Sequence, residues 1–387
     1  MEAESANRRF EGFSPLLFAG LAIASIGGPL ALPNFLPGTA GEEGIASAGL
    51  VVLLAVAVFT APLVLWLVYS RRVVSPGGLT AFVEAAAGRQ AALVHGWIWA
   101  FAYFLYLPYT ITFVVYDVLT PIFPGLHPYR WVLELVLPVA IVLLVLAPLR
   151  VALAALVLVG LAQLVLMLVL GGVTLDHVPV RFAHEPSLDP IGRGVGGTAL
   201  LFICASLPLY LGAEVRGGSR TVRRSLVAAV AVVSVCFFVA ALPLATAPGA
   251  LLDFPVPAAT IAKYYSGRPL EIAVALGIAG GTLALIVAEY LALGRLLHWL
   301  HGVPLRRVLV WIAAPFVIAD AISLIDPEKF YDKLLKPSLG ALFVSQLIVF
   351  VVFPLFRRGV RWLPLVAVAS GLAVWGFYTL VSGSAST

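Results

Sequence analysis

The chain has 387 residues, of which 61% are hydrophobic and only 11% are charged. A soluble domain carries about 25% charged residues, so this composition excludes soluble enzymes and nucleic-acid-binding proteins. The mean hydropathy of +1.05 indicates a membrane protein instead. In such a protein, the net charge of +5 is expected to come from Lys and Arg in loops that face the cytoplasm.

Apolar runs long enough to cross a bilayer recur along the whole chain. A transmembrane helix needs about 20 mostly apolar residues, so the sequence predicts an all-α polytopic membrane protein, one transporter domain over residues 1–387, with eleven spans. The expected spans are 14–33, 45–69, 91–118, 130–148, 151–172, 194–213, 222–247, 270–297, 307–325, 336–356 and 360–382.

The basic residues predict how these spans are oriented. With the N-terminus in the cytoplasm, 16 of the 24 Lys and Arg residues, including Arg8 and Arg9, fall in inner segments and 8 in outer segments. This asymmetry favours a cytoplasmic N-terminus. Because eleven is an odd number, the C-terminus is expected outside, and the protein is expected to be a multi-pass protein of the cell membrane.

The spans also repeat. A shift of about 180 residues places spans 1–5 (14–172) onto spans 6–10 (194–356), and span 11 (360–382) is left over. The segments after spans 2 and 7 correspond independently, since Gly88-Arg89 and Gly267-Arg268 lie 179 residues apart. Five spans per copy place the copies in opposite orientations. The sequence therefore predicts a five-plus-five inverted repeat.

Helix-breaking residues occur at equivalent places in the two copies. Span 1 contains Gly27-Gly28-Pro29 and span 6 contains Ser206-Leu207-Pro208, each about twelve residues into its span. Proline removes a backbone donor, and glycine lowers the cost of unwinding. Paired breaks in inverted repeats are typical of the binding site of a secondary transporter. The alternative is a simple proline kink in each helix.

Several segments resemble one known family. Ile26-Gly27-Gly28-Pro29-Leu30, Gly77–Glu84, Glu214–Arg224 and Leu293–Leu297 follow each other in the order and spacing of the amino acid–polyamine–organocation (APC) superfamily permeases. The resemblance covers almost the whole chain. It implies an alternating-access transporter with discontinuous helices 1 and 6 and with the substrate between their breaks. Span 6 differs from the family pattern, because no glycine stands at its break.

The break residues suit a zwitterionic substrate. Amides near Gly27 and Gly28 at a positive helix end favour a carboxylate, and carbonyl groups near Cys204 and Ala205 can accept from an amino group. We therefore expect an amino acid or related amine as substrate. The tyrosines of span 3 and Tyr210 are expected to wall or close the pocket, with core packing as the alternative. The expected substrate-binding residues are Ser25, Ile26, Gly27, Gly28, Tyr106, Tyr109, Cys204, Ala205, Ser206 and Tyr210.

Three residues are candidates for coupling or gating. Glu289 lies inside span 8, where an ionisable residue is a functional candidate; it either carries a coupling proton or pairs with an arginine. Thr282 in the same span offers a hydroxyl to a sodium ion or bonds back to its own helix. Glu214, at the inner end of span 6, is expected to form a gate salt bridge or a helix-end contact rather than to bind substrate. No cluster of sodium-like ligands is visible, so a proton is favoured as the coupling ion.

Other classes lack their signatures in this sequence. We expect no enzyme, because the acids are scattered and no nucleophile motif or histidine pair at metal spacing marks a catalytic or metal site. We expect no channel, because no filter loop repeats. No cofactor and no nucleic-acid partner are expected; the partners are a small-molecule substrate, a coupling ion and the bilayer. Amino acid exchange and sodium symport remain alternatives within the transporter class.

Overall fold

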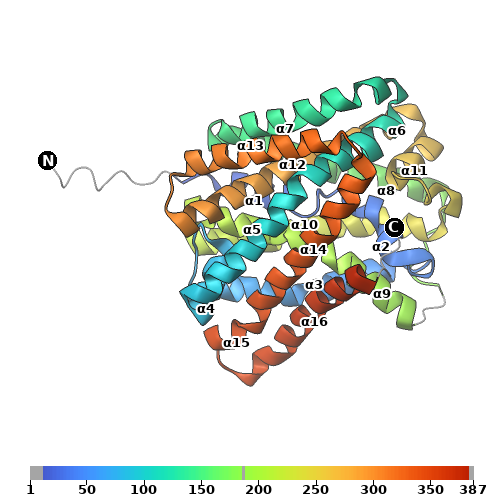
Figure 1. The fold of residues 1–387 in the computed structure, drawn as a ribbon. Coiled ribbons are helices and arrows are strands. Elements are labelled where there is room, and N and C mark those ends of the chain that lie inside the picture. Colours follow the sequence, from blue (N-terminus) through green and yellow to red (C-terminus); the bar gives the residue numbers. More distant parts are fainter. Residues whose placement is uncertain (1–11, 185–187, 383–387) are drawn as a thin grey trace.

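The computed structural model describes residues 12–184 and 188–382, which form a bundle of helices (Figure 1). Arg8 and Arg9, which contribute to the predicted orientation, lie outside these residues. The α-helices are α1 (Pro15–Ala24), α2 (Ala31–Ile45), α3 (Ala48–Tyr69), α4 (Gly78–Ala87), α5 (Arg89–Thr112), α6 (Thr120–Ile122), α7 (Arg130–Leu146), α8 (Leu149–His177), α9 (Leu188–Leu200), α10 (Gly218–Ala241), α11 (Pro257–Ser266), α12 (Arg268–His301), α13 (Leu305–Ser323), α14 (Pro327–Val351), α15 (Phe353–Phe356) and α16 (Leu363–Ser382). The helices of other types are η2 (Phe113–Leu119), a π-helix, and the 3₁₀ helices η3 (Pro124–Tyr129), η4 (Ile203–Glu214), η5 (Leu242–Thr246), η6 (Gly249–Leu251) and η7 (Val360–Trp362).

The predicted all-α membrane fold is confirmed. Within the described residues, nine helical stretches are long and apolar enough to cross a membrane, and they correspond to nine of the eleven expected spans. The other two expected spans are also helical. Span 1 is divided into α1 and α2, and span 9 is α13, which carries Arg306, Arg307 and Asp320 and is therefore less apolar.

The two connectors that suggested the repeat have the same local structure. The amphipathic helices α4 and α11 are both 10 residues long, and they lie at opposite ends of the bundle (Figure 1). Each ends at a glycine with a positive φ: Gly88 has φ 86° and ψ 174°, and Gly267 has φ 84° and ψ −175°. Glycine reaches this region at little cost because it has no Cβ. The equivalence expected from the sequence therefore extends to backbone conformation.

The arginines after these glycines make equivalent contacts in opposite directions. Arg89 begins α5 and donates to the carbonyl of Leu300 at the end of α12, at 3.3 Å. Arg268 begins α12 and donates to the carbonyl of Ile122 at the end of α6. Each cation thus meets the negative end of the other copy's helix, where it is stabilising. These contacts connect the antiparallel helices α5 and α12 near both of their ends.

The long helix α12 lies at the centre of the bundle. It packs against α5, α8, α13 and η4, and it also touches α1. The helices α7 and α13 pack on each other along one edge (Figure 1), while α16 packs on α3 and α14. At the start of α14, Asp326 caps the helix by accepting from the amide of Lys329. The Lys329 ammonium and this amide hold the pKa of Asp326 below its usual range.

Candidate functional site

The first break separates α1 from α2. Gly27 and Gly28 have φ values of 62° and 63°, which only glycine adopts readily, and Pro29 follows them. The chain leaves the helical path after Ala24 and resumes it at Ala31. The amides of Gly27 and Gly28 donate no hydrogen bond within the described part of the chain. The predicted discontinuity of helix 1 is confirmed.

The second break lies earlier in span 6 than the sequence suggested. The α-helix α9 ends at Leu200, and η4 begins at Ile203 as a 12-residue 3₁₀ helix. The expected break at Ser206-Leu207-Pro208 is thus wrong in position, since Pro208 lies inside η4. Runs of 3₁₀ helix longer than 3–4 residues are uncommon and mark strain or function. The discontinuity of helix 6 is therefore a change of helix type.

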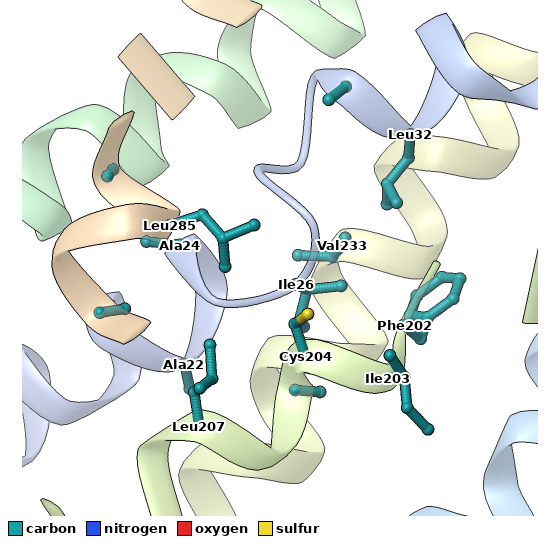
Figure 2. Close-up of a cluster of buried hydrophobic side chains, with 14 of the residues drawn as sticks. Ala22, Ala24, Ile26, Leu32, Phe202, Ile203, Cys204, Leu207, Val233 and Leu285 are labelled. Carbon is teal, nitrogen blue, oxygen red and sulfur yellow. The ribbon is translucent and has the colours of Figure 1, made fainter. Parts of the chain in front are cut away.

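The two breaks face each other. A Cβ placed on Gly27 would lie 3.1 Å from the carbonyl oxygen of Leu201, the residue that follows α9. Ile26, Cys204 and Leu285 belong to one buried apolar cluster at this place (Figure 2). The hydroxyl of Ser25 is buried and donates to its own helix at Leu21, at 2.7 Å. In this conformation, side chains of α1, η4 and α12 therefore cover the space between the breaks.

A glutamine from α8 also reaches the first break. The side-chain oxygen of Gln163 accepts a hydrogen bond from the amide of Leu30 at 3.2 Å, and Gln163 is fully buried. A Cβ on Gly281 of α12 would lie only 2.1 Å from the same oxygen, and a Cβ on Gly28 would lie 3.0 Å from the carbonyl carbon of Gly281. The amide of Gln163 therefore occupies the junction of the break, α8 and α12. Beside it, the hydroxyl of Thr282 donates to Ile278 at 2.9 Å.

Glu289 lies close to the second break. Its carboxyl group interacts electrostatically with the hydroxyls of Tyr103, Tyr106 and Tyr109 and with the thiol of Cys204. The hydroxyl of Tyr103 donates to the sulfur of Cys204 at 3.8 Å. Glu289 is fully buried, and its oxygens have no hydrogen-bond partner among the described residues. The structure thus joins span 3, span 6 and span 8 around one unpaired acid.

The tyrosines of span 3 belong to a longer chain of aromatic rings. From one end to the other, the chain consists of Tyr210, Trp99, Tyr103, Tyr106, Tyr109 and Tyr331, with centroid separations of 4.3, 4.1, 6.3, 4.9 and 5.4 Å. Tyr210 packs on α4, where a Cβ on Gly78 would lie 2.6 Å from its ring. Tyr210 therefore lies at the α4 end of this aromatic chain, while Tyr106 and Tyr109 lie toward α14.

The end of η4 is tied to two other elements. Arg295 of α12, whose side chain is 3% exposed, forms a two-point ion pair with Glu214 at 2.5 and 3.0 Å. The backbone of Phe13, just before α1, accepts from Arg216 and donates to Glu214, both at 3.0 Å. The expected salt bridge of Glu214 is therefore formed. Together these contacts hold α1, η4 and α12 close at one end of the bundle.

Two further buried acids lie away from this site. Glu134 of α7 and Asp320 of α13 are fully buried, and neither carboxyl has a hydrogen-bond partner among the described residues. They interact electrostatically with each other, not with the tyrosines that surround Glu289. No group of three or more His, Cys, Asp or Glu within the described residues could hold a metal ion.

Seven of the ten expected substrate-binding residues fall into two neighbouring groups, and the other three, Tyr106, Tyr109 and Tyr210, belong to the aromatic chain. Ser25, Ile26, Gly27 and Gly28 line the first break, and Cys204, Ala205 and Ser206 lie early in η4. Sequence reasoning missed three contributors: Gln163 at the first break, Tyr331 at the end of the aromatic chain, and Gln346, which donates to Ser206 at 3.4 Å. Polar residues inside apolar spans are the signal that would have identified the two glutamines.

Comparison with known proteins places the fold among solved transporters. No family model and no curated protein matches the chain. The chain is similar to a Na⁺-coupled sialic acid symporter solved in a substrate-bound outward-open state, with a TM-score of 0.63 and 12% identity over 97% of this chain and 91% of that one. It is also similar to a manganese transporter from Eremococcus coleocola, with a TM-score of 0.60 and 13% identity over 96% and 88%. At this level of identity, what the chain shares with these polytopic membrane transporters is their fold.

Proposed function

We propose that this protein is a secondary active transporter of amino acids or related amines that works by alternating access. We further propose that it is a proton-coupled permease of the APC superfamily. The observation that carries the proposal is the meeting of the two breaks beside an unpaired buried acid: Gly27 lies against Leu201, and Glu289 lies within electrostatic range of Cys204. The fold shared with solved transporters supports the same reading.

The first break provides the proposed carboxylate site. The unpaired amides of Gly27 and Gly28 lie just before the N-terminus of α2, where backbone donors and the helix dipole favour an anion. Carbonyl groups near the second break, at Cys204 and Ala205 in the first turn of η4, are the proposed acceptors for the amino group. The apolar side chain of Ile26 is suited to contact the carbon atoms of the substrate. If the backbone of the protein holds the carboxylate and amino groups of the substrate, the residues that line the pocket determine which substrate side chains fit.

Glu289 is the proposed carrier of the coupling proton. A carboxyl group at membrane depth without a hydrogen-bond partner is stable only when it holds a proton or meets a cation. In the closed conformation described here, the neighbours of Glu289 are Tyr103, Tyr106 and Cys204, which are neutral groups. Opening on one side would let water or a substrate ammonium reach the carboxyl, so that the proton leaves as the substrate site changes sides.

The junction of spans 1 and 8 supports a proton rather than sodium. A sodium ion between these helices needs several oxygen ligands and room for them. Here the amide of Gln163 occupies the gap beside Gly281, and the hydroxyl of Thr282 is directed to its own helix. Gln163 also links to Leu30, so α8 braces the break without an ion.

A thermal-shift screen of amino acids and amines on the purified protein tests the substrate class. A ligand that binds only the folded state raises the melting temperature. The screen is repeated on Gly27→Leu, whose side chain blocks the space near Leu201, and on Gly38→Leu as control, because a Cβ on Gly38 meets no atom within 4 Å. A ligand that stabilises the parent and Gly38→Leu but not Gly27→Leu supports the proposal. A ligand that stabilises all three equally contradicts it.

A further inference from the structure

Two adjoining cavities lined by arginine open at the ends of α3, α10 and α15. The first has a volume of about 520 Å³ and is lined by Arg71, Arg72, Arg357 and Arg361, with Trp362 as one wall. The second has a volume of about 540 Å³ and shares Arg71 with the first. Its other basic residues are Arg220, Arg223 and Arg224. No Asp or Glu belongs to the described lining of either cavity.

These arginines come from three separate segments that the fold brings together. Arg71 and Arg72 follow α3, and the hydroxyl of Ser219 at the start of α10 donates to the carbonyl of Ser70 at 2.6 Å. This hydrogen bond sets the first turn of α10, with its three arginines, beside the end of α3. Arg357 lies between α15 and η7, across the first cavity. The positive charge is therefore assembled by tertiary structure.

Each cavity also has an apolar wall from helices that cross the membrane. Val68 and Phe356 line the first, while Leu67, Val227 and Ala231 line the second. Val227 is 45% exposed on the outer surface of α10. The second cavity thus opens onto the surface that faces the acyl chains. Guanidinium groups bind phosphate at two points, and interfacial aromatic rings such as Trp362 lie at the level of lipid headgroups.

We propose that these two cavities form a binding site for the phosphate headgroup of an anionic phospholipid in the adjacent leaflet. The arginines hold the phosphate, and the apolar walls hold the first part of the acyl chains. A soluble anion would gain nothing from the apolar walls, which is why a lipid is the occupant that fits both surfaces. Basic pockets between transmembrane helices are known to bind such headgroups.

The test is native mass spectrometry of the full-length protein purified in detergent and titrated with phosphatidylglycerol. Phosphatidylcholine with the same acyl chains is the comparison lipid. The expected result is saturable, preferential retention of phosphatidylglycerol. In the double variant Arg71→Gln/Arg357→Gln, retention is expected to weaken about 25-fold, since each basic residue near an anionic lipid surface contributes about fivefold.

The control variant Arg306→Gln/Arg307→Gln removes two exposed arginines at the start of α13, outside both cavities. It should bind phosphatidylglycerol like the parent. Equal melting temperatures of all variants in detergent without added lipid establish that folding is unchanged, and a variant that fails this check is replaced by Arg361→Gln. Equal loss in the control pair would overturn the proposal, because binding would then follow total charge. Displacement of the lipid by glycerol phosphate at the same concentration would also overturn it.

Discussion

Gln163 and Leu30, which are 133 residues apart, share a buried hydrogen bond that connects α8 to the first residue before α2. The bond holds the break in helix 1 against Gly281 of α12. A break in a membrane helix leaves backbone groups that lipid cannot satisfy. Gln163 is therefore the side chain that makes the open backbone at Leu30 stable in this conformation.

Replacing Gln163 by leucine should destabilise the protein. The volume is similar, but the amide of Leu30 loses its acceptor, and an unsatisfied buried donor costs about 1–3 kcal/mol. The measurement is the free energy of unfolding in detergent by chemical denaturation. Gln163→Glu keeps an acceptor oxygen and should recover most of the loss when its carboxyl is protonated at low pH. Equal stability of Gln163→Leu and the parent would contradict the role of this bond.

Alanine at Gly28 should impair folding and binding together. Its φ of 63° costs an L-residue about 1–2 kcal/mol, and the new Cβ would lie 3.0 Å from Gly281. Gly38→Ala in α2 is the matched control, because a Cβ there meets no atom within 4 Å. Unfolding and ligand-induced thermal shift are measured for both. Equal stability and equal thermal shifts of the two variants would contradict the proposed role of Gly28.

The repeat predicts equal costs at two distant glycines. Gly88 and Gly267 have nearly identical backbone angles, and a Cβ has ample space at both. Alanine at either position should therefore cost the same, about 1–3 kcal/mol, because a positive φ with ψ near 180° is a region that essentially only glycine occupies. Gly125→Ala, at a glycine without a positive φ, should cost less. Unequal costs at Gly88 and Gly267 would argue against equivalent connectors.

Loss of Arg295 should open the end of the bundle near η4. Arg295→Gln removes the two-point pair with Glu214, and hydrogen bonds to charged groups contribute about 1.5–3 kcal/mol each. In a Cys236→Ala background, Cys204 should react with a maleimide tenfold faster or more. Arg306→Gln, which removes an exposed charge of α13, should leave the rate unchanged. A rate in Arg295→Gln equal to that of the parent would show that the pair does not hold this end closed.

The sequence predicted the spans and the first break well, for physical reasons. Bilayer thickness sets the length of an apolar run, and Gly27-Gly28-Pro29 cannot continue a helix at ordinary cost. The connectors ending at Gly88 and Gly267 were recognisable because their turn needs glycine. These features depend on local chemistry alone.

The remaining features of the site depend on how the helices pack, which the sequence of a membrane protein does not indicate. A span that is apolar all round gives no period from which to read its inward face, so the direction of Gln163 could not be predicted. The change of helix type already at Ile203, ahead of the expected break at Ser206-Leu207-Pro208, was not readable from local propensity; η4 packs against α1, α4, α10 and α12 there. The proximity of Glu289 to Tyr103 and Cys204 likewise could not be predicted, because it depends on how three helices are rotated relative to one another.

Uptake into vesicles that contain the purified protein, with pH and sodium gradients imposed separately, shows whether Glu289 couples substrate movement to protons. The substrate is the amino acid or amine identified by thermal shift. We expect saturable accumulation driven by the pH gradient, its loss in Glu289→Gln, and its retention in Glu134→Gln, which alters a buried acid outside the site. Accumulation driven by sodium alone, or unchanged pH-driven accumulation in Glu289→Gln, would contradict this expectation.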